Sequence, residues 1–188
     1  MKIRGIFGTI LVITLLLFSG TNQVNAGDKS EPNFIDNQND TIQYWDIISA
    51  WFCEEPNNKD ILRIHLKMNE QSQYIRSIII IRFTCGDIEY CIKSTISFFG
   101  IPYSILTTHN TDTRNNEVFP VKTNIDFEQN IIRFKIPKYI CNNMKEGALI
   151  TNTYVSASYI HAGLFNRNLL IYSLFHDTVF GNNYQIQY

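Results

Sequence analysis

The amino-acid sequence predicts an all-β protein, a two-layer antiparallel β-sandwich of the immunoglobulin-like or jelly-roll kind preceded by a signal peptide. Eight or nine short segments rich in aliphatic and aromatic residues recur at fairly regular spacing, and turn-forming residues separate them. No segment shows the periodicity of an amphipathic helix. A succession of strands without interleaved helices is typical of antiparallel sandwiches, and a closed barrel is the alternative.

The first 26 residues are organised like a secretory signal peptide. Lys2 and Arg4 precede an uncharged, mainly apolar stretch at residues 6–18, and the tripeptide VNA ends at Ala26 with light residues where signal peptidase requires them. We therefore expect cleavage between Ala26 and Gly27, and a secreted or extracytoplasmic product. The alternative is a retained anchor, but the apolar stretch is shorter than the roughly 20 residues that a membrane-spanning helix needs.

The charge of the mature chain excludes two classes of partner. Loss of Lys2 and Arg4 from the 16 basic residues leaves 14 against 17 acidic residues, a net charge of −3. No basic cluster accompanies this weak balance, so we expect neither nucleic acid nor an anionic membrane surface as a partner. We also expect no membrane insertion after the signal is removed.

The mature chain has the length of one domain. Residues 27–41 are polar and predict a flexible lead-in, in which Asn39 fits the acceptor pattern for N-glycosylation. Residues 42–188 predict a single sandwich domain.

The strands follow from local patterns. Residues 44–53 carry apolar groups on both faces, as in a strand covered on two sides, whereas residues 61–68 alternate with period two, as in a strand with one wet face. The long stretch at residues 100–117 is polar and predicts the least structured part of the domain. Pro137 and Gly147 fit the start and the exit of one helical turn. The predicted strands cover residues 44–53, 61–68, 74–83, 88–98, 124–127, 131–136, 148–160, 169–174 and 183–188.

The four cysteines predict two disulfides, because an even number in an oxidising compartment is typical of structural cross-links. The five residues between Cys85 and Cys91 match neither a CxxC redox centre nor a structural zinc site. If Gly86-Asp87 forms a two-residue turn, Cys85 and Cys91 lie on opposite faces of the hairpin, whereas a wider loop sets them opposite each other. We favour the local pair Cys85–Cys91, with Cys53–Cys141 as its companion, because closing a short loop costs little entropy.

Catalytic signatures are missing from the sequence. It contains no GxSxG elbow, HExxH, P-loop, GxGxxG or EF-hand motif, so we expect a protein without catalytic activity, although scattered catalytic groups leave an enzyme as an alternative. His65 falls on the polar side of its predicted strand and is expected to be solvated. His176 and Asp177 are adjacent on a strand and therefore point to opposite faces.

Two further features suggest ligands. Asp112, Asn115 and Glu117 supply oxygen donors of the kind that calcium prefers, although turns are rich in such residues for backbone reasons alone. No other cofactor is indicated. Trp45 and Trp51 share one face of their predicted strand and are candidates for stacking on sugar rings if that face is outward.

Several segments resemble a known group of secreted domains. The succession YWDIISAWF, ILRIHLKM, IIRFKIPKYI, ALITNTYVSAS and DTVFGNNYQIQY, with Asp46 opening the first strand and Ile136-Pro137-Lys138 closing a later one, resembles β-sandwich domains related to DOMON and to the family 9 carbohydrate-binding modules, including uncharacterised archaeal secreted proteins. The resemblance covers residues 42–188 and implies binding of sugars or haem.

Taken together, the sequence predicts a secreted, non-catalytic binding module whose ligand is a carbohydrate or another component of the cell envelope. A structural or protein-interaction subunit of the cell envelope, with an envelope protein as its partner, is the alternative.

Overall fold

The fold is seen in a computed structural model, which describes residues 29–30, 32–36, 46–55, 57–70, 76–97, 99–110, 113, 116–141, 143–165 and 168–187. For residues 159–165 and 168–176 it describes the backbone.

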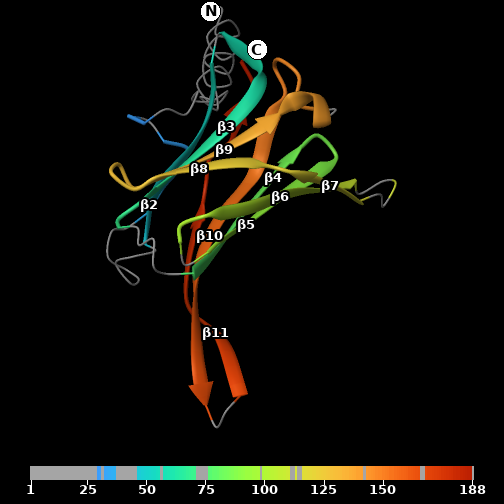
Figure 1. The fold of residues 1–188 in the computed structure, drawn as a ribbon. Coiled ribbons are helices and arrows are strands. Elements are labelled where there is room, and N and C mark those ends of the chain that lie inside the picture. Colours follow the sequence, from blue (N-terminus) through green and yellow to red (C-terminus); the bar gives the residue numbers. More distant parts are fainter. Residues whose placement is uncertain are drawn as a thin grey trace, which may run out of the picture.

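Two antiparallel sheets pack face to face, which confirms the predicted all-β sandwich (Figure 1). The five-stranded sheet has the order β1 (Phe34–Ile35), β2 (Ile47–Glu55), β3 (Asn58–Met68), β9 (Ile131–Pro137), β8 (Lys122–Asp126). The seven-stranded sheet has the order β11 (Asn168–Phe180), β10 (Leu149–Phe165), β4 (Arg76–Cys85), β5 (Ile88–Ile96), β6 (Pro102–Asn110), β7 (Asn116–Pro120), and β12 (Tyr184–Gln185) also pairs with β10.

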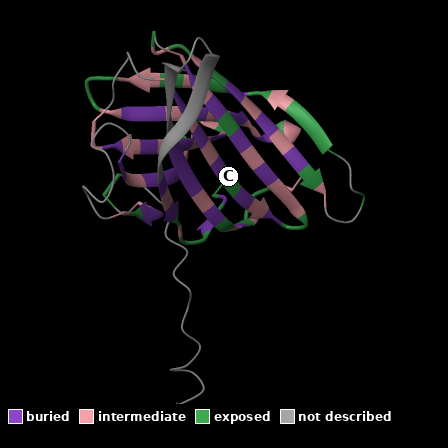
Figure 2. Cartoon of the chain, turned by 90° about the horizontal axis from the view of Figure 1, so that it is seen from below, coloured by how far each residue is buried: buried purple, intermediate pink, exposed green. Residues whose placement is uncertain are grey.

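Alternation along the strands fills the space between the sheets. Leu62, Ile64 and Leu66 of β3 are fully buried, as are Ile79 and Ile81 of β4, while the residues between them are only partly buried. The same alternation is visible along the strands in Figure 2. Strands β3 and β4 therefore contribute every second residue to one shared core, and their other residues face outward.

The stretch at residues 100–117 is not the unstructured excursion that its polarity predicted. It forms β6 and β7, which pair antiparallel from Ile105↔Pro120 to His109↔Asn116. The residues of β6 that face inward include the hydroxyl groups of Ser104 and Thr108 beside the fully buried Leu106. The Ser104 hydroxyl donates to Ser94 Oγ at 2.8 Å and accepts from Thr123 Oγ1 at 2.7 Å, so the buried polar groups satisfy one another.

Part of the predicted flexible lead-in is packed into the sandwich. Phe34 of β1 is 1 % exposed and its ring centre lies 6.0 Å from that of Phe52. The backbone N–H of Phe52 donates to Asn33 Oδ1 at 2.9 Å, and a Cβ at Gly181 would lie 2.4 Å from the Phe34 ring. The domain core therefore includes residues well before position 42.

The predicted helical turn is present as the 3₁₀ helix η2 (Lys138–Ile140), and Gly147 leaves the following loop with φ +81°, a value that favours glycine. Within the described residues, no helix has the length and apolar character needed to span a membrane.

A buried polar group joins η2 to the end of the chain. The Glu54 carboxylate, with a side chain 1 % exposed, pairs with the ammonium of Lys138 and accepts from Tyr184 Oη at 3.0 Å and from the backbone N–H of Gln187 at 2.6 Å. Because its partners all come from within the fold, this carboxylate stabilises the sandwich and is not open to a ligand.

Candidate functional site

The predicted site residues have different outcomes. Trp51 is 4 % exposed and its ring meets that of His65 edge-on at 5.1 Å, so Trp51 offers no open face for a sugar. Six predicted residues lie outside the part of the chain that the structure describes: Ala26, Gly27, Asn39, Trp45, Asp112 and Asn115.

The third calcium candidate, Glu117, is exposed on β7. Near it, His109 Nδ1 lies 2.7 Å from Asn116 Oδ1 across the β6–β7 pair. Among the described residues, no three His, Cys, Asp or Glu side chains lie together as a metal-binding group.

The predicted disulfides are not formed, and all four cysteines are free thiols. Gly86-Asp87 is a two-residue turn, so Cys85 pairs in register with Ile88, and Cys91 pairs with Arg82. Cys85 therefore faces the core and Cys91 faces outward, which separates the expected local pair.

The expected companion pair is also absent, because Cys53 belongs to the outer face of the five-stranded sheet and Cys141 is in the core. The thiol of Cys85 donates to the backbone carbonyl of Asn143 at 3.3 Å. Burial raises the pKa of Cys85, and burial together with the nearby Cys85 raises the pKa of Cys141 to about 12. Both interior thiols are therefore protonated at neutral pH and are poor nucleophiles.

Cys53 and His65 form the one thiol–imidazole contact on the described surface, with Sγ and Nε2 3.7 Å apart. His65 is half-buried, not solvated as its strand parity predicted, because Trp51 packs against it. Burial, with the charges of Arg133 and Arg63, lowers the pKa of His65 to about 4, and burial raises the pKa of Cys53 to about 11. At neutral pH both groups are uncharged, so this pair does not supply the activated thiolate that cysteine-dependent catalysis needs.

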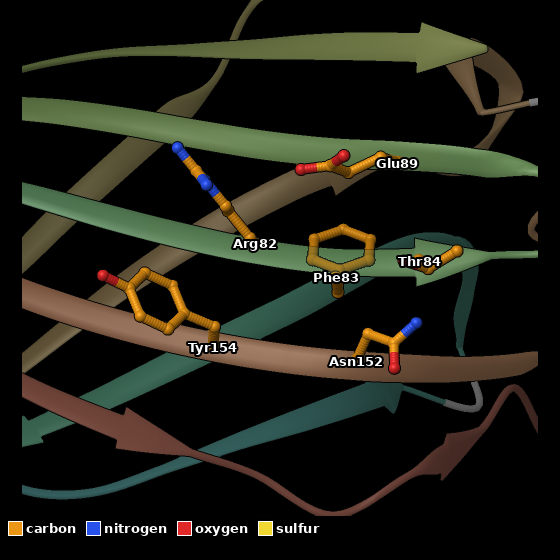
Figure 3. A pocket seen from close by; sticks show the side chains of 6 residues that line it. All are labelled: Arg82, Phe83, Thr84, Glu89, Asn152 and Tyr154. Carbon is orange, nitrogen blue, oxygen red and sulfur yellow. The ribbon is translucent and has the colours of Figure 1, made fainter. Parts of the chain in front are cut away.

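A hollow lies on the outer face of the seven-stranded sheet, where β10, β4 and β5 run side by side (Figure 3). This hollow has a volume of about 330 Å³, at the lower end of the range for small-ligand sites. Its lining residues are Arg82, Phe83, Thr84, Glu89, Asn152 and Tyr154.

An irregularity in β10 creates the hollow. Thr151 pairs with Thr84 and Tyr154 pairs with Arg82, so two residues of β10 lie opposite the single residue Phe83. Asn152 sits in this bulge with φ +50°, a left-handed conformation that asparagine tolerates better than most residues. The side chain of Phe83 is fully buried and stacks on Tyr90, with ring centres 5.2 Å apart, so Phe83 contributes backbone to the hollow.

Aromatic rings form one side of the hollow. The Arg82 guanidinium lies over the Tyr154 ring, 6.0 Å from its centre. On the neighbouring strand, the ring of Phe180 lies 5.5 Å from that of Tyr154 and is 76 % exposed. The pair Tyr154–Phe180 therefore presents aromatic surface to solvent beside the polar lining.

The polar groups of the lining balance in charge. Arg82 is positive and Glu89 is negative, and the two lie on neighbouring strands without an ion pair between them. Thr84 and Asn152 add a hydroxyl and an amide, which both donate and accept hydrogen bonds. The hollow thus offers donors and acceptors with no net charge.

Comparisons of this chain with protein-family models, with curated proteins and with solved structures find no match.

Sequence reasoning missed this site because its residues come from three strands and only the strand register brings them together. One signal was available. The apolar residues of β10 that join the core change from the even position Ile150 to the odd positions Val155 and Ala157, and this change of phase marks the bulge.

Proposed function

We propose that this protein is an exported, non-catalytic β-sandwich that binds a neutral carbohydrate of its surroundings or of the cell envelope in the hollow between β10, β4 and β5. The observation that carries the proposal is the aromatic pair of the partly buried Tyr154 and the exposed Phe180, next to a polar lining of zero net charge. Sugar rings stack their C–H faces on aromatic rings, and their hydroxyl groups both donate and accept hydrogen bonds.

The lining matches that chemistry group by group. Arg82 supplies donors, Glu89 supplies acceptors, and Asn152 supplies both. A charged ligand would be repelled by whichever of the two side chains carries the same charge, whereas a neutral polyhydroxylated ligand is repelled by neither.

Export is the second part of the proposal. It is supported by the signal-like residues 1–26 and by the resemblance of the strand succession to secreted carbohydrate-binding sandwiches. Amino-terminal sequencing of the product released by the native host should begin at Gly27, and an intact leader on a cytosolic product would overturn this part.

Binding is tested with residues 27–188 on a glycan array, followed by titration calorimetry of each hit. Tyr154→Ala and Phe180→Ala should each weaken binding by about tenfold, because each removes roughly 1.4 kcal/mol of aromatic contact. Tyr139→Ala is the matched control, since Tyr139 is 80 % exposed on η2, away from the lining of the hollow. Silence across the array, or equal losses from all three variants, would contradict the proposal.

A protein-interaction subunit of the envelope is the second candidate. It is favoured by exposed apolar side chains at the turn between β5 and β6 and at the start of β6, where Phe99 is 83 %, Ile101 65 % and Tyr103 72 % exposed. Affinity purification with Phe99→Ser should then lose a stoichiometric partner that the unchanged chain retains. A glycan hit with no protein partner would decide against it.

A further inference from the structure

Strands β10 and β11 continue beyond the rest of the seven-stranded sheet. Among the described residues, the pairing of β10 with β4 reaches Ile160↔Arg76, whereas its pairing with β11 continues from His161↔Tyr172 to Phe165↔Asn168. Figure 1 shows this two-stranded ribbon projecting away from both sheets. A two-stranded ribbon alone is marginally stable in water, and three or more strands are needed for independent stability.

Each strand of the ribbon has an outer edge, and the longer of the two belongs to β11. Within the described strands, β11 is the outermost member of the seven-stranded sheet and pairs along one side with β10. The backbone N–H and C=O groups of its other side therefore require a partner, which can be water or another strand.

The sequence of this edge lacks the features that normally prevent strand pairing. Residues 168–175 read NLLIYSLF, without charge, proline or glycine. The other edge strands differ: β7 has five residues including Glu117 and Pro120, and β8 has five including Lys122 and Asp126. The fourth edge strand, β1, has only two residues.

We propose that two copies of this chain associate by antiparallel pairing of their β11 edges about a two-fold axis. The joined ribbons form a four-stranded sheet, which is the smallest assembly that meets the requirement for more than two strands. A second copy fits better than an arbitrary strand because it supplies an edge of the same length, and because an uncharged segment opposite itself brings no like charges together. The inference is independent of carbohydrate binding.

The test is sedimentation velocity of residues 27–188 without sugar over a wide range of concentration. We expect a dimer that dissociates to a monomer on dilution. Ile171→Lys, near the middle of the uncharged segment, should raise the dimer dissociation constant at least tenfold, because symmetry brings the two lysines near each other. Val118→Lys is the matched control, since it places the same charge on β7 at the opposite edge of the same sheet and should leave the constant unchanged.

A second variant keeps the test decisive if Ile171→Lys fails to fold. Replacing residues 161–172 by Asn-Gly closes the hairpin after Ile160↔Ser173 with a favoured two-residue turn and removes the ribbon. This variant should be a folded monomer. The proposal would be overturned if the unchanged chain is a monomer, whether or not its ribbon binds lipid vesicles. It would also be overturned if the dimer survives both changes, or if the chain forms open polymers in place of a closed dimer.

Discussion

Lys138 and Glu54 form an ion pair inside the sandwich, with side chains 8 % and 1 % exposed. Glu54→Gln leaves the ammonium buried without a counter-charge, so we expect a loss of about 3–5 kcal/mol in the free energy of unfolding. Chemical denaturation measures it. Glu55→Gln is the control, because Glu55 is 48 % exposed where it pairs with Arg63, and should cost about 1 kcal/mol or less. Equal costs for the two variants would show that the buried pair is not formed.

Packing of the amino-terminal strand is tested at Gly181. Gly181→Ala would place a methyl group 2.4 Å from the Phe34 ring, and we expect it to cost about 1–3 kcal/mol through overpacking. Phe34→Leu in the same chain should recover part of that loss, because the smaller side chain makes room. If Gly181→Ala is neutral by thermal and chemical denaturation, Phe34 does not pack where the structure places it.

Stability should depend on pH through Asp177. Burial and the charge of Asp36, opposed by the bond from the Ile47 amide, together raise the pKa of Asp177 from 3.8 to about 6. The folded state therefore holds more protons than the unfolded state between these values, so the free energy of unfolding falls as pH rises from about 4 through about 6.

Asp177→Asn should remove this fall, and denaturation curves at a series of pH values measure it. Asp126→Asn is the comparison, because hydrogen bonds from Gln129 and Arg133 lower the pKa of Asp126 and give it the opposite sign. The Asp126 variant should keep the fall with rising pH. If the free energy of unfolding of the unchanged chain does not fall over this pH range, the raised pKa of Asp177 is contradicted.

The charge balance of the hollow predicts how selectivity changes. Glu89→Gln leaves Arg82 as the net charge of the lining and should improve binding of carboxylated sugars relative to their neutral counterparts, whereas Arg82→Gln should do the reverse. Exposed charges contribute about 1 kcal/mol or less, so each change should be fivefold or less and weaken with added salt. Competition titrations with matched neutral and acidic sugars decide, and identical selectivity in both variants would exclude a ligand at this position.

The rate of thiol labelling should reflect how deeply each cysteine is buried. Cys85 and Cys141 should resist alkylation until the chain unfolds, because both are buried and burial raises the pKa of both. Cys53 should react slowly at pH 8, since its pKa is raised to about 11. Mass spectrometry of peptides from the unreduced protein checks the assignment, and a Cys85–Cys91 disulfide would mean that the hairpin differs from the one described.

Local patterns were sufficient for much of the fold. Alternation in β3, the aliphatic run in β4 and the turns at Gly86-Asp87 and residues 127–130 locate strands and hairpins from neighbouring residues alone. The pattern failed at β6, because Ser104 and Thr108 are polar in sequence yet buried in the fold, where hydroxyl groups on β5 and β8 and the pairing with β7 accommodate them. Burial of polar residues depends on partners distant in sequence, which a local pattern does not contain.

The hollow was beyond sequence reasoning for a similar reason. Arg82 and Tyr154 are far apart along the chain, and they meet because the register of β4 on β10 shifts between Thr151 and Tyr154. The cysteines show the same dependence, since the choice of turn at Gly86-Asp87 decided which of them face the core.

The extra residue in β10 also determines which side of that strand is which. Val155 and Ala157 face the core because two residues of β10, Asn152 and Thr153, lie opposite the single residue Phe83 of β4. If β10 alternated regularly from Ile150 without the bulge, Tyr154 and Ser156 would point toward the core and Val155 and Ala157 would point to the outer face. The outline of the hollow and the choice of which β10 side chains enter the core thus depend on the same two amino acids, Asn152 and Thr153.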